Sequence, residues 1–132
     1  MAHATAIIGA KRYETTITTG SHGLIADEGP DLGGENAGPA PYDLLLSGLG
    51  ACTAITLKMY AERKGWDLQT LRVELKLYKE GDRTHIHRTL HPEGVLDADQ
   101  RARLADIAER TPVTLTLKAG ADILTELAPM AG

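Results

Sequence analysis

The pattern of hydrophobic and polar positions predicts an α+β fold that begins with three short strands. Residues 4–8, 13–19 and 22–26 are rich in Thr, Ile, Leu and Tyr and are separated by turn residues, which is typical of an antiparallel meander. Residues 27–40 are rich in Gly and Pro and poor in apolar side chains. This composition predicts a long loop.

A long helix is predicted over residues 41–64. Pro41 suits the first helical position, Asp43 places a negative charge in the positive first turn, and Gly65 provides a stop. Residues 44–57 carry no charge, and their apolar side chains fall on every side of the helix. This pattern predicts a helix that is buried all round.

The uncharged part of this helix is best interpreted as a core segment. It is shorter than the roughly 20 residues that a bilayer requires, and Ser47, Thr53 and Thr56 interrupt it. Gly48 and Gly50 are expected where another element, such as a second helix, approaches closely. Because one small sheet cannot cover every side of such a helix, we expect a second subunit to complete the enclosure.

The next segments predict two strands and a second helix. Apolar and polar side chains alternate over residues 71–78, which indicates a strand with one buried face. A turn at 79–82 leads into a strand over 83–91. Asp97 and Gln100 have the spacing of a capping box at a helix start. The buried side of that helix is expected to carry Leu104, Ile107 and Ala108.

The C-terminal region allows two interpretations. Alternation over residues 113–117 is compatible with a strand. Thr111 and Pro112, however, suit the N-cap and first position of a short helix that ends at Gly120. We favour the helix, and residues 122–127 are then expected to form the last strand.

Length, charge and cysteine content narrow the class of protein. The 132 residues suit one domain with one core. There are 14 Lys and Arg against 18 Asp and Glu, with no basic run, so we expect neither nucleic acid nor a membrane surface as a partner. The N-terminus lacks signal-peptide features. The single cysteine, Cys52, excludes an intrachain disulfide and fits a reducing, cytoplasmic setting.

Three histidines of the predicted strand over 83–91 were considered as metal ligands. His85, His87 and His91 share one face of that strand. Residues 85 and 91 would lie about 20 Å apart along a straight strand, so only the first two could bind one ion. A solvated sheet face is the favoured interpretation, and we expect no metal and no cofactor.

Four segments form a recognisable set, residues 39–52 (PAPYDLLLSGLGAC), 58–65 (KMYAERKG), 96–104 (LDADQRARL) and 111–113 (TPV). With these motifs the chain resembles the OsmC/Ohr family of osmotically inducible protein C and organic hydroperoxide resistance proteins over nearly its whole length. The resemblance implies an OsmC-like intertwined homodimer, with antiparallel sheets around two long central helices and sites at the interface. It also implies a peroxiredoxin-like thiol peroxidase that reduces organic hydroperoxides in oxidative stress defence, using an attacking and a resolving cysteine.

The chain departs from the family pattern at the expected site. Cys52 takes the place of the attacking cysteine, whereas Thr111 stands where the resolving cysteine is usual. The usual glutamate falls on Tyr42, next to Asp43. The family's arginine in the early strands has no clear counterpart. The nearest candidates for its role as activating cation are Arg12 and His22.

The chemistry of peroxide reduction sets further conditions on Cys52. A thiolate attacks the peroxide, and burial disfavours a charged sulfur, so a positive group has to come from elsewhere in the fold or from a partner chain. Asp43 would lie about 13 Å away along the same helix, so an acidic helper has to come across the dimer. Without a second cysteine, an external thiol or dithiol reductant must resolve the sulfenic acid. The aliphatic surround of the thiol favours an apolar, organic hydroperoxide.

A second hypothesis assigns the chain to a different class. It is a non-catalytic dimer of the same fold that binds small apolar ligands and keeps Cys52 as a structural core residue. The absence of a sulfur at Thr111 favours this hypothesis. The rate of reaction with an organic hydroperoxide discriminates between the two.

Overall fold

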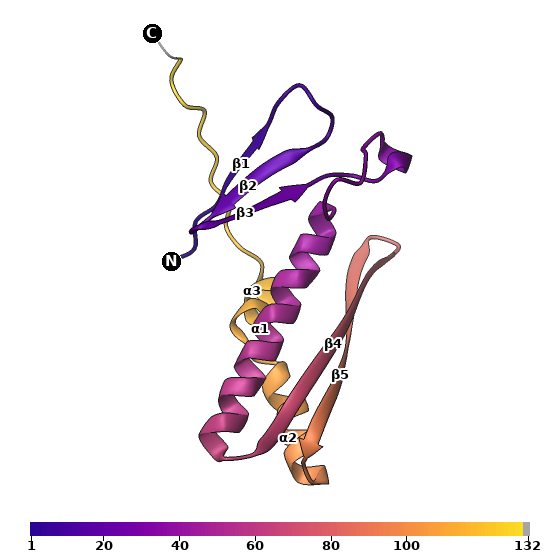
Figure 1. The fold of residues 1–132 in the computed structure, drawn as a ribbon, viewed down its shortest axis with the longest axis vertical. Helices are drawn as coiled ribbons and strands as arrows, with labels where there is room; N and C mark the ends of the chain where they lie inside the picture. The colour runs from indigo at the N-terminus through magenta and orange to yellow at the C-terminus, as the bar shows by residue number, and fades with distance from the viewer. Residues whose placement is uncertain (131–132) are drawn as a thin grey trace. The chain divides into compact units, whose positions relative to one another are not determined.

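The computed structural model describes residues 1–130 and has the α+β architecture that the sequence predicts. Figure 1 shows its elements in chain order, which are β1 (Thr5–Ile8), β2 (Thr15–Thr19), β3 (His22–Ala26), the short 3-10 helix η1 (Pro30–Leu32), α1 (Pro41–Lys64), β4 (Asp67–Glu80), β5 (Arg83–Val95), α2 (Ala98–Ala108) and α3 (Pro112–Ala119). The chain divides into two compact units, Met1–Gly50 with Glu74–Thr89 and Ala51–Val73 with Leu90–Gly132. Helix α1 and the hairpin of β4 and β5 contribute to both.

The first unit contains the predicted antiparallel meander. The strand order is β1, β2, β3, with Ile7 opposite Thr16 and Ile17 opposite Leu24. The three strand predictions are therefore confirmed within one or two residues at each end. The other part of this unit is the turn end of the β4 and β5 hairpin.

The loop after β3 is held by the carboxylate of Asp27, which is buried. One of its oxygens accepts the backbone N–H groups of Tyr13 and Glu28 at 3.2 and 2.7 Å, and the other accepts those of Glu35 and Ala37 at 3.2 and 3.1 Å. These bonds, with Ala37 contributing most, hold the pKa of Asp27 below its usual value. A loop without much apolar surface is thus ordered by one anion.

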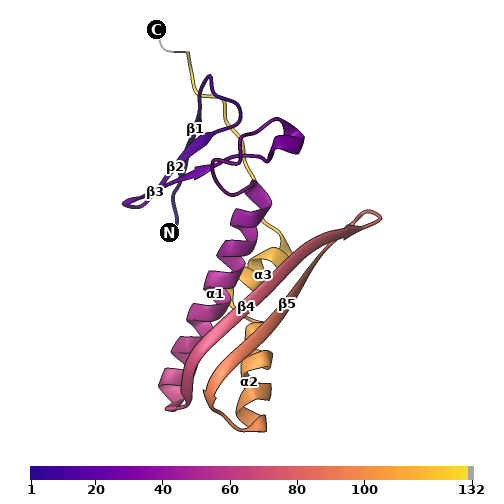
Figure 2. The same ribbon diagram turned by 45° about the vertical axis from the view of Figure 1, so that its right-hand side comes forward.

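The second unit contains the hydrophobic core. Leu57 and Ala61 of α1 pack with Leu68 of β4 and with Leu104 and Ala108 of α2. Figures 1 and 2 show α2 beside the hairpin in the two views. The predicted buried side of α2 is confirmed, and so is its capping box, because Asp97 and Gln100 exchange bonds of 2.8 and 2.9 Å.

Helix α1 has the predicted bounds but is not buried all round within this chain. Its buried positions recur every four residues, at Leu49, Thr53, Leu57 and Ala61. This spacing makes one stripe, because residues four apart share a helix face. Other apolar side chains of α1 are exposed, and among the described helices α1 alone has the length and composition of a membrane span. The exposed ones include Leu45, Ile55 and Met59.

The two glycines of α1 differ in what lies beside them within this chain. A side chain at Gly50 would come 3.0 Å from the Leu75 methyl group on β4, so the close neighbour is a strand. Around Gly48 the described residues leave open space within 4 Å. The prediction that another element approaches closely is therefore confirmed at Gly50, where that element is a strand, and it stays a prediction at Gly48.

The C-terminal predictions have mixed outcomes. Residues 112–119 form a helix, as favoured, because Pro112 starts it and Gly120 follows its end with a positive φ of 79°. The predicted strand over 122–127 is wrong, since no regular element follows α3 up to residue 130. The side chains of Ile123 and Leu127 are exposed. A strand needs a paired neighbour for its backbone groups, and this segment has none among the described strands.

Candidate functional site

The site is built around Cys52, which is half-buried on α1. Its Sγ accepts the backbone N–H of Val113 at an N–S distance of 3.4 Å. Val113 is the second residue of α3, and the N–H groups of the first helical turn have no acceptor inside their own helix. The fold therefore directs an otherwise unused N–H and the positive end of a helix dipole at the sulfur.

A hydroxyl group also lies near the sulfur. Thr56 is four residues after Cys52 on α1, and its Oγ1 lies 3.9 Å from Sγ. Residues four apart on a helix lie one above the other, and helical side chains lean toward the N-terminus, so the hydroxyl of Thr56 points back toward Cys52. Two protein groups thus approach the sulfur, one from each of two helices.

The residue in the resolving position is part of the buried structure next to α3. Thr111 is fully buried, and its hydroxyl lies 2.6 Å from that of Thr114. The Thr114 hydroxyl also donates to the carbonyl oxygen of Ala108 at 3.4 Å. Thr111 occupies the N-cap, as predicted, but its side chain makes no capping hydrogen bond. It lies two residues before Val113, so the family's resolving position is close in sequence to the group that contacts the sulfur.

The other predicted site residues belong to the first unit. Arg12 and His22 are exposed, Arg12 in the connection from β1 to β2 and His22 at the start of β3. Asp43 lies in the first turn of α1, where its carboxylate accepts the N–H of Ala40 at 3.4 Å. This bond supports the start of the helix. The roles of these three residues toward Cys52 stay predictions.

A group of charged side chains surrounds Tyr60 on the exposed part of α1 and α2. Arg103 donates to the Tyr60 hydroxyl at 3.1 Å and to Asp106 at 2.9 Å, and Arg110 bonds Asp106 through two nitrogens at 2.8 and 3.0 Å. The Arg103 bond lowers the pKa of Tyr60, and the Arg110 bond lowers the pKa of Asp106. Because each cation is matched by an anion or a phenol, this cluster is a surface network that ties α2 to α1.

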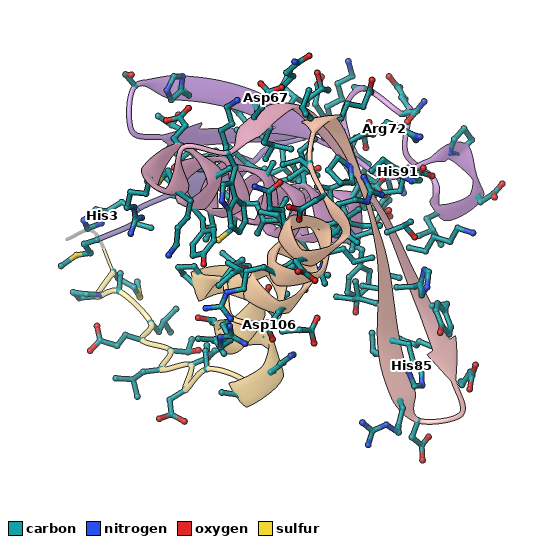
Figure 3. All side chains as sticks on the ribbon, turned by 90° about the horizontal axis from the view of Figure 1, so that it is seen from below. His3, Asp67, Arg72, His85, His91 and Asp106 are labelled. Atoms are coloured by element: carbon teal, nitrogen blue, oxygen red, sulfur yellow. The ribbon has the colours of Figure 1, made fainter. Side chains whose placement is uncertain are left out.

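Residues of the types that could bind a metal ion are dispersed in the part of the chain that the structure describes. Within it, no group of three His, Cys, Asp or Glu side chains could hold an ion. Figure 3 labels His85 near the turn of the hairpin, where its ring stacks on Tyr78 at a centroid distance of 5.3 Å. This packing agrees with the interpretation of the histidine face as a sheet surface.

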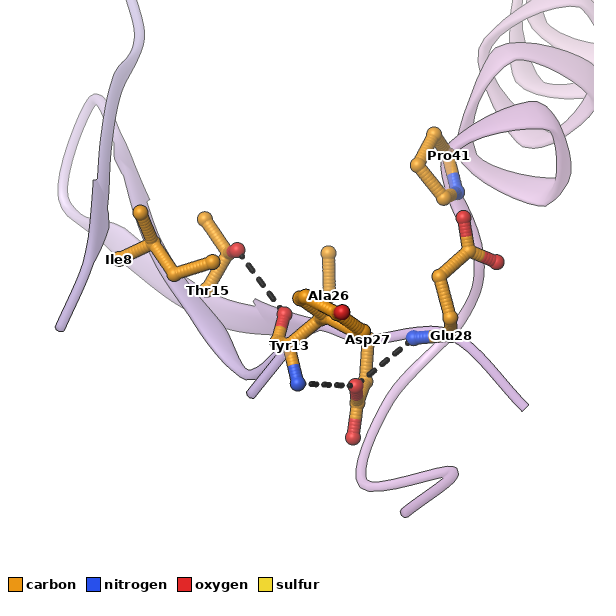
Figure 4. Close-up of a pocket in the computed structure, with 7 residues that line it drawn as sticks. All are labelled: Ile8, Tyr13, Thr15, Ala26, Asp27, Glu28 and Pro41. Atoms are coloured by element: carbon orange, nitrogen blue, oxygen red, sulfur yellow. Dashed lines mark hydrogen bonds between the residues drawn. The ribbon is translucent and has the colours of Figure 1, made fainter. Parts of the chain in front are cut away.

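A shallow pocket of about 250 Å³ lies in the first unit (Figure 4). Its lining residues are Ile8, Tyr13, Thr15, Ala26, Asp27, Glu28 and Pro41. Figure 4 shows the bonds from the N–H groups of Tyr13 and Glu28 to Asp27, and the bond from the Thr15 hydroxyl to the Tyr13 carbonyl. The Asp27 carboxylate in this pocket is thus engaged in holding the loop.

The fold and site define a small α+β protein whose single thiol meets the N-terminus of a helix. A model of the OsmC-like protein family matches residues 33–126, and the chain belongs to this family. The family membership that the sequence predicted is thereby confirmed. No curated protein matches the chain.

Solved structures of related proteins have the same fold. An OsmC-like protein from Mycoplasma pneumoniae is 20% identical with a TM-score of 0.73, covering 89% of this chain and 87% of that one. The organic hydroperoxide resistance protein OsmC from Legionella pneumophila is 22% identical with a TM-score of 0.64, covering 89% of both chains. OhrB, the organic hydroperoxide resistance protein of Bacillus subtilis, is 21% identical with a TM-score of 0.62, covering 92% and 93%. At these identities the similarity establishes the fold.

Sequence reasoning identified Cys52 but missed its hydrogen-bond donor. Val113 is an apolar residue 61 positions away, and its side chain gives no sign of a polar role. The available signal was Thr111 and Pro112, which predict a helix start and therefore a set of unused N–H groups. What the sequence could not supply was the direction in which those groups point.

Proposed function

We propose that this protein reduces organic hydroperoxides through Cys52 as a one-cysteine peroxidase of the OsmC family. The observation that carries the proposal is the bond from the Val113 N–H to Cys52 Sγ at the start of α3. A backbone N–H donor and a helix N-terminus both favour the thiolate, which is the form that attacks a peroxide. The names of the Legionella and Bacillus neighbours support the same substrate class.

In the proposed reaction, the sulfur of Cys52 is the atom of the protein that changes its oxidation state. The thiolate attacks one peroxide oxygen, an S–O bond forms, and the O–O bond breaks. The departing alkoxide takes up a proton and leaves as an alcohol, while Cys52 becomes a sulfenic acid. Because Thr111 has no sulfur, an external thiol condenses with the sulfenic acid and releases water. A second thiol then regenerates Cys52 and leaves as a disulfide, which suits a reducing, cytoplasmic setting.

We further propose that two copies of this single domain form the active species. Leu45, Ile55 and Met59 are 39%, 55% and 54% exposed on α1, and the apolar segment after α3 is exposed as well. Apolar surface of this kind is expected to be covered by another subunit. Arg12, His22 and Asp43 of a second copy are then candidates to act near Cys52. Sedimentation equilibrium tests this point, and a monomer at micromolar concentration contradicts it.

Stopped-flow mixing with cumene hydroperoxide tests the activity. We expect Cys52 to react much faster than free cysteine and to give a sulfenic acid that dimedone traps, as read by mass spectrometry. Cys52→Ser is the matched control and should give neither signal. A rate no higher than that of free cysteine, with no trapped adduct, contradicts the proposal.

The variant Thr111→Cys tests the assignment of the resolving position. If residue 111 corresponds to the family's second cysteine, peroxide treatment should convert this variant to an internal disulfide and reduce dimedone labelling. Thr116→Cys, at an exposed position of α3, is the control. Equal dimedone labelling of the two variants contradicts the assignment.

A second candidate function is a non-catalytic module that binds small apolar ligands. It is favoured by Thr111, whose buried hydroxyl bonds Thr114 where redox chemistry would need a sulfur. This candidate predicts that cumene hydroperoxide leaves Cys52 unmodified, while an apolar fluorescent probe binds wild type and Cys52→Ser equally. Rapid oxidation of Cys52 contradicts it.

A further inference from the structure

Cys52 shares its face of α1 with a hydroxyl whose role the sequence does not reveal. Thr56 is half-buried, and its Oγ1 lies 3.9 Å from Sγ. In the middle of a helix, a threonine hydroxyl commonly donates to the carbonyl group four residues earlier. That carbonyl belongs to Cys52, so the same rotating hydroxyl can serve either the backbone or the sulfur of one residue.

The protonation state of the sulfur decides which way this hydrogen bond runs. A thiol can donate its proton to the threonine oxygen, whereas a thiolate has no proton and can only accept. When Cys52 is ionised, the Val113 N–H is already directed at Sγ, and the Thr56 O–H is the second donor within reach. Hydrogen bonds to ionised groups are stronger than those between neutral groups.

We infer that Thr56 is a second hydrogen-bond donor to the reacting sulfur, so that its hydroxyl and the Val113 N–H together hold the Cys52 thiolate. This inference rests on the proposed function for its biological meaning, but the hydrogen bond itself can be measured without any peroxide. Both donors reach the half-buried sulfur from within one chain. The proton stays on Thr56 throughout, and the hydroxyl transfers nothing to the peroxide.

A donor to a thiolate has two opposite effects on reactivity, and these distinguish it from a structural role. It increases the fraction of sulfur that is ionised, but it makes each thiolate less nucleophilic, with a Brønsted coefficient of about 0.4–0.5. If the bond changes the ionisation equilibrium about tenfold, losing it should lower the rate about threefold at pH values below both midpoints and raise the rate plateau at high pH about threefold. The two pH profiles should therefore cross.

The experiment measures the second-order rate of Cys52 alkylation by iodoacetamide between pH 5 and 10. Thr56→Val removes the hydroxyl but keeps the branched shape of the side chain, and Thr56→Ser keeps the hydroxyl. We expect the midpoint of the Thr56→Val profile to move to higher pH, with a higher plateau, and Thr56→Ser to stay close to wild type. Thr116→Val, the same change at an exposed position of α3, should leave the profile unchanged.

The possible outcomes separate this inference from the proposed function. Coincident profiles for wild type and Thr56→Val overturn the inference, even if peroxide still oxidises Cys52. Crossing profiles in a protein that does not react with cumene hydroperoxide support the inference and contradict the peroxidase. If Thr56→Val loses its helical circular dichroism, Thr56→Ala provides the same test with a residue that favours helix.

Discussion

The two units of the chain differ in the interactions that stabilise each of them internally. The second unit packs Leu57, Leu68 and Leu104 into a core that excludes water almost completely. In the first unit, the buried apolar residues among those described are Ala26 and Leu49, while Ile7 and Ile8 of β1 are exposed. Its order comes instead from strand pairing and from the four N–H groups bound by Asp27.

This difference bears on the proposed function because Cys52 belongs to the second unit. A thiol that depends on a hydrogen bond of 3.4 Å needs a rigid background, and close-packed apolar side chains supply it. The first unit, by contrast, leaves apolar side chains of β1 exposed, including Ile7 and Ile8. In the proposed dimer, the second unit would position the sulfur and the first would supply surface for the other subunit.

The largest effect should come from opening the core of the second unit. Leu104→Ala removes a fully buried side chain and is expected to lower the free energy of unfolding by about 2–5 kcal/mol, because a cavity remains. Ile25→Ala, on β3 of the first unit, should cost clearly less, since this side chain is 39% exposed. Urea denaturation measures both. Equal losses of unfolding free energy would contradict the difference between the apolar core of the second unit and the hydrogen-bonded first unit.

The loop of the first unit should lose its order locally when the Asp27 carboxylate is removed. Asp27→Ala leaves the N–H groups of Tyr13, Glu28, Glu35 and Ala37 without their acceptor, so hydrogen exchange there should become faster. Protection of the second-unit core should change much less. Exchange followed by mass spectrometry resolves the two regions, and uniform acceleration in both would contradict the prediction.

The same carboxylate makes the first unit sensitive to acid. Hydrogen bonds hold the pKa of Asp27 below its usual value of 3.8, so its contribution to stability is complete above that pH. The contribution is lost as the pH falls through the lower folded value. We therefore expect the protection factors of the loop amides, which are corrected for the intrinsic pH dependence of exchange, to fall on acidification below about pH 4 in wild type. In Asp27→Ala they should show no further fall at these sites.

A smaller effect is expected at the N-cap of α2, where the sequence predicts the capping box. Asp97→Ala removes the capping bond to the N–H of Gln100 and should cost about 1 kcal/mol of unfolding free energy. Asp97→Asn, which keeps a side-chain acceptor, should recover most of the loss. Thermal denaturation compares the two, and a loss as large as that of Leu104→Ala would mean that the core is not the dominant support.

The smallest effect concerns the surface network between α1 and α2. Arg103→Leu removes the donor that lowers the pKa of Tyr60, so this phenol should ionise at higher pH, closer to its usual 10.0. Difference absorbance near 295 nm follows the titration, with Tyr60→Phe identifying its contribution. An unchanged titration would contradict the bond.

The sequence predicted most local structure because the relevant signals are local. Pro41 and Gly65 bracket α1, and the reciprocal bonds of Asp97 and Gln100 start α2, as their spacing indicates. The strand expected over 122–127 is absent because a strand needs a partner for its backbone groups, and the residues of this segment do not show whether one is present. The all-round burial of α1 requires the expected second subunit and stays a prediction, since burial depends on what surrounds a helix.

For the candidate site, the sequence by itself determined the single sulfur, its place on the long helix and the absence of a sulfur at Thr111. Only the tertiary structure decided that the start of α3 meets Cys52, and that Thr56 and Val113 approach the same atom. The physical reason is that hydrogen bonds depend on direction and on distances of a few ångströms. Between residues 61 positions apart, packing of the helices alone sets that geometry.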